Sequence, residues 1–147
     1  MRIEPNPDGV EIEIEPELVD FLIRFPDMLD GLGPDDPASR RLNVPVYLDD
    51  PEANAEWWGF MGSELAESRR ADRSAFREVL AAAKTGTVMS RAEAWATIRV
   101  VNEARLGHAA RVGVEVESDY QTLEPHDLHL LEALAQLQMA IIWALEQ

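Results

Sequence analysis

Residues 124–147, EPHDLHLLEALAQLQMAIIWALEQ, carry the most regular apolar pattern in the chain. Leucine and isoleucine recur at intervals of three and four residues, which is the spacing of one face of an α-helix. Glu124 followed by Pro125 is typical of a helix start. The stretch therefore predicts a C-terminal helix with an apolar face made of Leu130, Leu134, Leu137, Ile141 and Leu145.

This face is wider than one packing contact requires, because four more apolar residues extend it: Leu128, Leu131, Met139 and Ile142. A face of this width is either buried on two sides within the chain or forms a contact between two subunits. The sequence therefore leaves two arrangements open, a monomer with a deeply buried last helix and a homodimer.

Two amphipathic segments precede this helix. Over Ser63–Lys84 the apolar residues fall on one helical face. Ser90 with Glu93 three positions later has the spacing of a capping box, so we expect a second helix to begin there. This second helix should end near Gly107 or Arg111.

Proline marks the starts of the earlier helices. Pro16 suits the first turn of a helix that is kinked or shortened at Pro26. Asp50-Pro51 reads as an N-cap followed by a first helical residue, and we expect Gly62-Ser63 to break the helix that follows. Between these helices the sequence predicts a loop with one short helical turn near residues 37–42.

Extended structure is predicted only near the N-terminus. Residues 10–14, VEIEI, alternate apolar and acidic side chains, which indicates a short strand or an extended arm. Residues 112–116, VGVEV, also alternate and could pair with it. We therefore predict an all-α fold, a single-domain bundle of about five or six helices over residues 16–147, with a short extended arm over residues 1–15.

Composition limits the class of protein. The chain has 147 residues, 46% hydrophobic and 28% charged, and it contains no cysteine. The absence of thiols excludes disulfides, thiol catalysis and thiolate metal sites. No apolar run approaches the roughly 18 residues that span a bilayer, and the first residues, MRIEPNPDGV, lack the features of a secretory signal. We therefore expect a cytoplasmic protein without membrane contact.

Charge is unevenly distributed along the chain. The formal net charge of −15 combines −9 over residues 1–36, −2 over 37–62, +3 over 63–111 and −7 over 112–147. Either the acidic flanks pack against the basic middle, or the middle presents a basic face to an outside partner. Because so acidic a chain repels phosphate backbones, we do not expect direct nucleic-acid binding.

Four polar side chains fall inside apolar helical faces. Arg69 and Asp72 lie on the apolar side of one predicted helix, and Asn102 and Arg105 lie on that of the next. A buried charge costs several kcal/mol unless it is paired, so the least costly arrangement pairs Asp72 with Arg105 and lets Asn102 fill the remaining bonds. The four residues form either a structural network between two helices or the lining of a binding pocket.

A basic ridge is predicted on the first of these helices. Arg70, Arg73, Arg77 and Lys84 follow one strip at spacings of three, four and seven residues. We expect this strip to face solvent, where it either holds an acidic partner or is simply hydrated, with Glu67 paired to Arg70.

Motifs of catalysis and metal binding are lacking. His126 and His129 are three residues apart, but a zinc site needs a third fixed ligand, so we predict surface histidines, no metal and no cofactor. The chain has no Ser-His-Asp spacing, glycine-rich phosphate loop or His-Glu-x-x-His stretch. Nothing in the sequence argues for an enzyme.

Several short motifs follow one another along the chain. They are Asp36-Pro37-Ala38-Ser39-Arg40-Arg41-Leu42, Tyr47-Leu48-Asp49-Asp50-Pro51-Glu52-Ala53, Glu56-Trp57, Ala94-Trp95 and Asn102-Glu103-Ala104-Arg105-Leu106-Gly107. Their order and spacing resemble those of an actinobacterial family of unknown function, over nearly the whole chain. This family includes the AosR-like oxidative-stress transcriptional regulators, whose genes often lie beside that of the ClpS proteolytic adaptor.

The resemblance implies a cytoplasmic, non-enzymatic regulator of transcription. Its partners would be proteins, such as an extracytoplasmic-function sigma factor. The redox-responsive members switch through a cysteine pair, which this chain cannot form. Any response to oxidant would therefore have to run through methionine or through a partner protein.

The alternative is a small-ligand-binding bundle with a pocket formed by Arg69, Asp72, Asn102 and Arg105. A cavity on the order of several hundred cubic ångströms beside poorly satisfied side chains would favour ligand binding. A compact network in which every donor is paired would favour the regulator.

Overall fold

The computed structural model describes residues 1–147 and combines helices with a small sheet. The α-helices are α1 (Pro16–Leu22), α2 (Arg24–Asp30), α3 (Pro37–Leu42), α4 (Pro51–Ala83), α5 (Arg91–Arg111) and α6 (Pro125–Leu145), with a 3₁₀-helix over Glu117–Thr122. The strands β1 (Arg2–Asn6), β2 (Gly9–Glu13) and β3 (Thr87–Met89) form an antiparallel sheet in the order β1-β2-β3. The fold is therefore α+β, and the all-α prediction is wrong.

Strand β2 is the part of the sheet that the sequence predicts. Val10 and Ile12 of this strand are buried, as the alternation requires. Gly9 begins β2 where its backbone passes very close to the end of β3, since a Cβ added to Gly9 would lie 1.9 Å from the carbonyl oxygen of Met89. Strand β3 is too short to show alternation, and β1 contains Pro5, so neither gives a strand signal.

Residues 112–116, whose alternation left a pairing with the N-terminal arm open, do not pair with it. These residues instead close the end of α5, where Gly113 has a φ of +85° and the Val114 N–H donates a 2.9 Å hydrogen bond to the Ala109 carbonyl. This is the Schellman arrangement that commonly ends helices. The edge of β2 that faces away from β1 is occupied by β3 instead.

The predicted helix starts are confirmed. Pro16 begins α1, and the chain divides into α1 and α2 shortly before Pro26. The Asp50 side chain accepts a hydrogen bond at the start of α4. Ser90 and Glu93 form both hydrogen bonds of the capping box, and the helix they open, α5, ends at Arg111.

Helix α4 does not break at Gly62-Ser63. It runs uninterrupted for 33 residues, which at 1.5 Å per residue is about 50 Å. A glycine inside a helix costs only about 1 kcal/mol relative to alanine, and the residues around Gly62 include good helix formers. The cost is therefore too small to end the helix.

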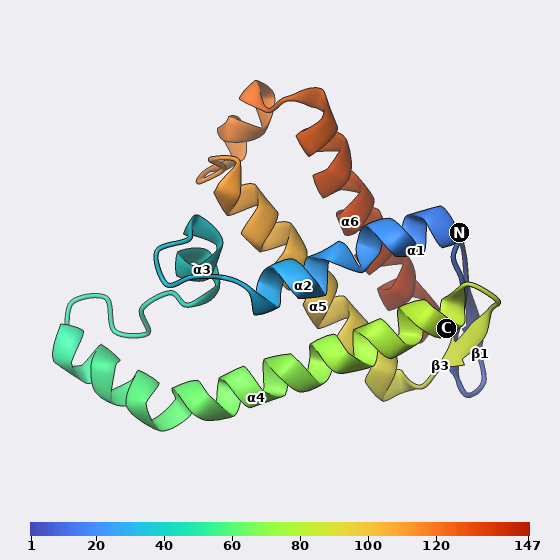
Figure 1. Cartoon of the computed structure of the whole chain (residues 1–147), viewed down its shortest axis with the longest axis horizontal. Helices are drawn as coiled ribbons and strands as arrows, with labels where there is room; N and C mark the ends of the chain where they lie inside the picture. Colours follow the sequence, from blue (N-terminus) through green and yellow to red (C-terminus); the bar gives the residue numbers. More distant parts are fainter.

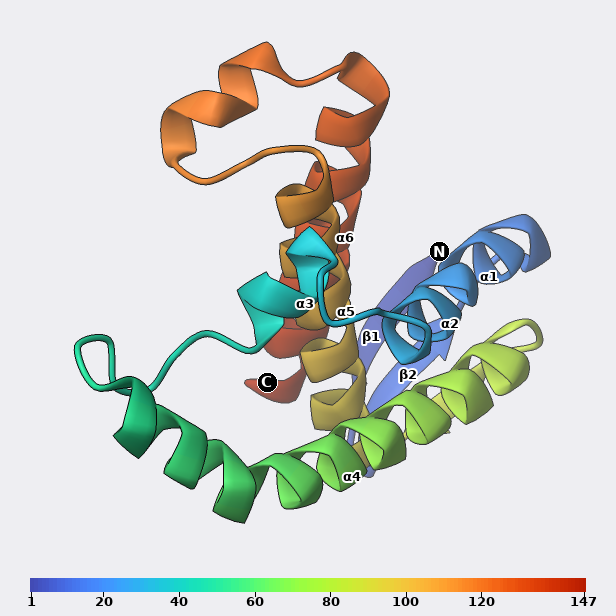
Figure 2. The same cartoon turned by 60° about the vertical axis from the view of Figure 1, so that its left-hand side comes forward.

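Only the C-terminal half of α4 joins the core. Its buried apolar residues are Phe76, Val79, Leu80 and Ala83, whereas residues 43–71 contain no buried residue at all. We call residues 43–68, which comprise the loop before α4 and its N-terminal half, the projecting segment. It extends away from the rest of the molecule, in green at one end of α4 (Figures 1 and 2).

The apolar face of α6 is mostly buried within the chain, against α5 and the sheet. Its buried residues are Leu131, Leu134, Leu137, Ile141, Ala144 and Leu145. Met139 and Trp143 remain exposed. By length and hydropathy α6 is apolar enough to cross a membrane, contrary to the expectation from the sequence, but the buried core helices of other proteins pass the same test.

Candidate functional site

The predicted pairing of Asp72 with Arg105 is wrong. The carboxylate of Asp72, which is buried, accepts two hydrogen bonds from Arg99, at 2.7 Å from Nε and 2.8 Å from Nη2. Arg105 instead donates a 3.2 Å hydrogen bond to Asn102 Oδ1 on its own helix. Arg99 lies at the edge of the contact between α4 and α5 and is half-exposed, so its long side chain reaches Asp72 while its charge stays partly hydrated. Pairing Asp72 with this half-exposed arginine costs less free energy than burying a second charge, that of Arg105, at the centre of the interface between the two helices.

The buried ion pair between the two helices is formed by other residues. Arg73 Nη2 of α4 lies 2.6 Å from Glu103 Oε2 of α5, and both side chains are about nine-tenths buried. Arg73 also bonds Asp30 of α2 at 3.1 Å. Arg73 therefore does not belong to a solvent-facing ridge, and a single guanidinium ties three helices together.

The basic ridge faces the acidic N-terminal flank. Arg77 Nη2 lies 2.6 Å from Asp30 and 2.9 Å from Asp27, and Lys84 lies 2.9 Å from Asp20. These contacts confirm that the flank packs against the basic middle. Of the four ridge residues, only Arg70 is exposed without an ion pair, and the expected pair with Glu67 is not formed.

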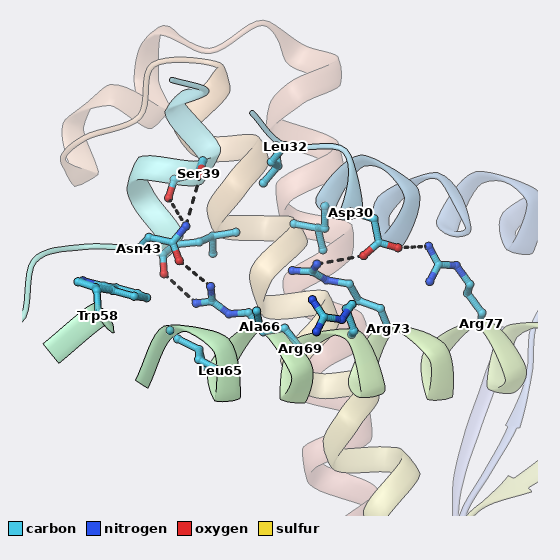
Figure 3. A pocket seen from close by; sticks show the side chains of 14 residues that line it. Asp30, Leu32, Ser39, Asn43, Trp58, Leu65, Ala66, Arg69, Arg73 and Arg77 are labelled. Carbon is cyan, nitrogen blue, oxygen red and sulfur yellow. Dashed lines mark hydrogen bonds and ion pairs between the residues drawn. The ribbon is translucent and has the colours of Figure 1, made fainter. Parts of the chain in front are cut away.

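A groove of about 450 Å³ lies beside this strip, between α4, the end of α2 and α3. Figure 3 shows its lining, with Trp58 at one end and Arg77 at the other. We call it the arginine groove, since four arginines line it: Arg69, Arg70, Arg73 and Arg77. The remaining lining residues are Leu29, Asp30, Leu32, Ser39, Leu42, Asn43, Trp58, Gly62, Leu65 and Ala66.

Arg69 is held in the groove by neutral groups. Its Nη1 donates a 2.7 Å hydrogen bond to Asn43 Oδ1, and its Nη2 donates a 2.8 Å bond to the Leu42 carbonyl. The Asn43 amide is itself fixed by a 3.0 Å bond to the Ser39 carbonyl. The Arg69 guanidinium is therefore oriented, while its positive charge has no carboxylate partner (Figure 3).

Asp30 is the one acid that lines the groove, and two of the groove's arginines bind it. Partial burial raises the pKa of Asp30, but hydrogen bonds from Arg77 and Arg73 lower it by more, so the pKa of this carboxyl lies below its ordinary value. Asp30 is therefore ionised at neutral pH and compensates part of the charge of Arg73 and Arg77.

The proposed pocket of four residues is not assembled. Of Arg69, Asp72, Asn102 and Arg105, only Arg69 lines the arginine groove. Sequence periodicity does not identify Asn43 or Trp58 as neighbours of Arg69. Both residues lie outside the two predicted helices on whose apolar faces the four polar side chains fall. No sequence signal points to Asn43, because the loop from α3 to α4 brings it alongside Arg69 only in the folded chain.

The histidines are not arranged around a metal. His126 is largely exposed and lies 3.3 Å from Asp127, which also contacts His108 at 2.8 Å. His129 is exposed. No group of three or more residues that could hold a metal ion is present in the structure.

The chain matches one known protein family over nearly its whole length. The sequence model of one family matches residues 2–147. The chain belongs to DUF2017, a domain family of unknown function. Membership of DUF2017 assigns neither an activity nor a link to the oxidative-stress regulators. No curated protein and no solved structure matches the chain.

Proposed function

We propose that this DUF2017 protein is a non-enzymatic regulator that acts by binding another protein. The observation that carries the proposal is the projecting segment, a long stretch with no buried residue. The large apolar side chains exposed on it are Val44, Val46, Tyr47, Leu48, Phe60 and Met61. Large apolar side chains that are exposed within one segment of the chain are typical of protein contact sites.

The energetics of α4 support a covered state. Most helical stability in proteins comes from packing of an apolar face rather than from the intrinsic propensity of the residues. The N-terminal half of α4 contains no fully buried residue, and its half-buried Trp57 and Trp58 contact each other edge to face, with ring centroids 5.0 Å apart. A partner that covers Leu48 and Phe60, which are 83% and 75% exposed, would supply the missing burial.

The resemblance to the oxidative-stress regulators gives the class of partner. We propose a cytoplasmic transcription protein, such as a sigma factor, and no direct contact with nucleic acid. The projecting segment carries six acidic residues and no basic one, so the contacting surface should be basic and apolar. Without cysteine, any response to oxidant would involve methionine, of which Met61 lies on this segment, or the partner itself.

A small-ligand function remains the second proposal, because one observation favours it. The arginine groove has the volume of a ligand site, and the Nε atom of Arg73, which lines it, is buried without a hydrogen-bond partner. Free carboxylates or phosphates that raise the melting temperature of the wild type, but not that of an Arg69→Gln variant, would support this function.

Affinity capture from a native host extract tests the regulatory proposal. Three baits are compared: the wild type, a double variant Leu48→Ser/Phe60→Ser, and a control Val116→Ser/Met139→Ser. The control removes apolar side chains from elsewhere on the surface that are 60% and 68% exposed. The proposal predicts an identified transcription protein with the wild type and the control but not with the first variant. Recovery of no transcription protein, or equal recovery by all baits, contradicts it.

A further inference from the structure

We infer that the arginine groove binds an acidic segment of the partner protein, whose carboxylates contact Arg69 and Arg70. This inference rests on the proposed function, because the groove adjoins the projecting segment and shares Trp58 and Leu65 with it. It adds a second, acidic segment of the same partner, beside the basic and apolar surface that we propose for contact with the projecting segment.

The charges of the groove point to an anionic occupant. Arg73 and Arg77 are compensated by Asp27, Asp30 and Glu103. Arg69 bonds only neutral oxygens, and Arg70 is exposed without an ion pair. In a chain with a net charge of −15, two guanidiniums that line one groove without carboxylate partners therefore form a local positive site.

Arg69 is also pre-organised to receive a carboxylate. When a ligand binds a mobile arginine, the side chain is immobilised and loses rotamer entropy, which costs on the order of 1 kcal/mol for each such side chain. The bonds from Arg69 to Asn43 and to the Leu42 carbonyl already fix its guanidinium. A carboxylate that reaches the remaining N–H groups would thus form charge-assisted hydrogen bonds without ordering Arg69 again.

The shape of the groove favours a polypeptide segment over a compact ligand. Trp58 and Arg77, which lie at its ends, are about 28 Å apart along α4 at 1.5 Å per residue. A volume of about 450 Å³ over that length describes a shallow channel open to solvent. Leucines line it between the arginines, among them Leu42 and Leu65. The occupant should therefore combine carboxylates with apolar side chains, as an acidic amphipathic helix does.

A continuous phosphate backbone fits this surface less well. The two uncompensated guanidiniums are flanked by Asp27 and Asp30 on one side and by the acidic projecting segment on the other. Nucleic-acid sites instead neutralise many phosphates in a row. The charge pattern suits one or two carboxylates.

Titration with synthetic peptides tests the inference. The probe is a helical peptide of about 20 residues, long enough to span the groove, with glutamates and leucines on one face. A glutamine version of the peptide and inorganic phosphate serve as comparison ligands. Binding is followed by isothermal titration calorimetry and by the NMR signal of the Trp58 indole. We expect the glutamate peptide to bind and shift this signal, and the glutamine peptide to bind at least tenfold more weakly.

Variants of the chain show where the acidic peptide binds. Arg70→Glu should weaken binding at least tenfold, and Arg69→Gln should weaken it too, with its fold checked by circular dichroism. Arg41→Glu is the matched control, because Arg41 is exposed but does not line the groove. Equal effects of Arg41→Glu and Arg70→Glu, absence of binding by the glutamate peptide, or equally tight binding of phosphate would overturn the inference.

Two further results separate this inference from the proposed function. If the transcription partner is still captured by the Arg70→Glu bait but not by Leu48→Ser/Phe60→Ser, the regulatory function stands and the groove inference falls. If sedimentation shows a dimer that Arg70→Glu dissociates, the acidic segment belongs to a second copy of this chain, and the partner assignment is overturned.

Discussion

Arg73 of α4 and Glu103 of α5 form an ion pair with 2.6 Å between Nη2 and Oε2, at a point where both side chains are about nine-tenths buried. The same arginine reaches Asp30 of α2 at 3.1 Å. This contact fixes the long helix α4 against the central helix α5 and thereby sets the direction in which the projecting segment leaves the body.

Removing one partner of this pair should destabilise the fold. In a Glu103→Ala variant, Arg73 keeps only Asp30, and its buried charge is under-compensated. We expect a loss of about 3 kcal/mol in the free energy of unfolding, as is typical for breaking a buried pair. Urea denaturation followed by circular dichroism measures it. A loss below about 0.5 kcal/mol would show that the pair does not hold the two helices together.

Gly9 should tolerate no side chain. A Cβ at this position would lie 1.9 Å from the Met89 carbonyl oxygen, and the φ of +150° is strained for other residues. We expect Gly9→Ala to cost at least about 2 kcal/mol by separating β2 from β3. Gly33→Ala is the control, because a Cβ there meets nothing within 4 Å. Equal unfolding midpoints for the two variants would contradict the close strand approach.

The carboxyl of Asp30 should make stability depend on pH. Because its pKa is lower in the folded chain than its ordinary value, its contribution is present above the unfolded pKa of about 3.9 and is lost as the pH falls through the folded pKa. Asp30→Asn should therefore be less stable than the wild type near neutral pH, and the difference should shrink below about pH 4. Denaturation curves across this range measure it, and a difference that stays constant would rule out the pairing of Asp30 with Arg73 and Arg77.

The two halves of α4 should differ in local stability. Residues 51–68 bury no side chain, whereas Phe76, Val79 and Leu80 anchor the second half in the core. Amide hydrogens of the first half should exchange at least about tenfold faster than those near Leu80, because helix without tertiary packing opens locally. Uniform protection along α4 in the free protein would mean that its first half is already covered.

Helix starts and the last helix follow directly from the sequence. Proline and N-cap residues act locally, so Pro16, Asp50 and the Ser90–Glu93 box lie where the pattern places them. The apolar face of α6 extends over the whole helix, so its periodicity is clear despite the few polar residues in this stretch. These features depend only on neighbouring residues, which is why a single sequence suffices to predict them.

The sheet and the polar contacts depend on tertiary structure instead. Strand β3 has three residues and exists because β2 offers it an edge, a relationship that periodicity does not record. Asp72 pairs with Arg99 because a long side chain at the edge of an interface reaches inward, whereas helical periodicity places only the Cβ atoms. The groove joins Arg69 to Asn43, 26 positions away, through a loop whose path the sequence does not reveal.

Hydrogen exchange on the purified protein with its captured transcription partner tests the central claim most directly. If the projecting segment is the contact surface, amides over residues 51–68 gain at least about tenfold protection in the complex, while those of the already buried helix α5 stay unchanged. Protection that appears elsewhere on the chain, with residues 51–68 exchanging as fast as in the free protein, would contradict the assignment of this segment as the binding surface.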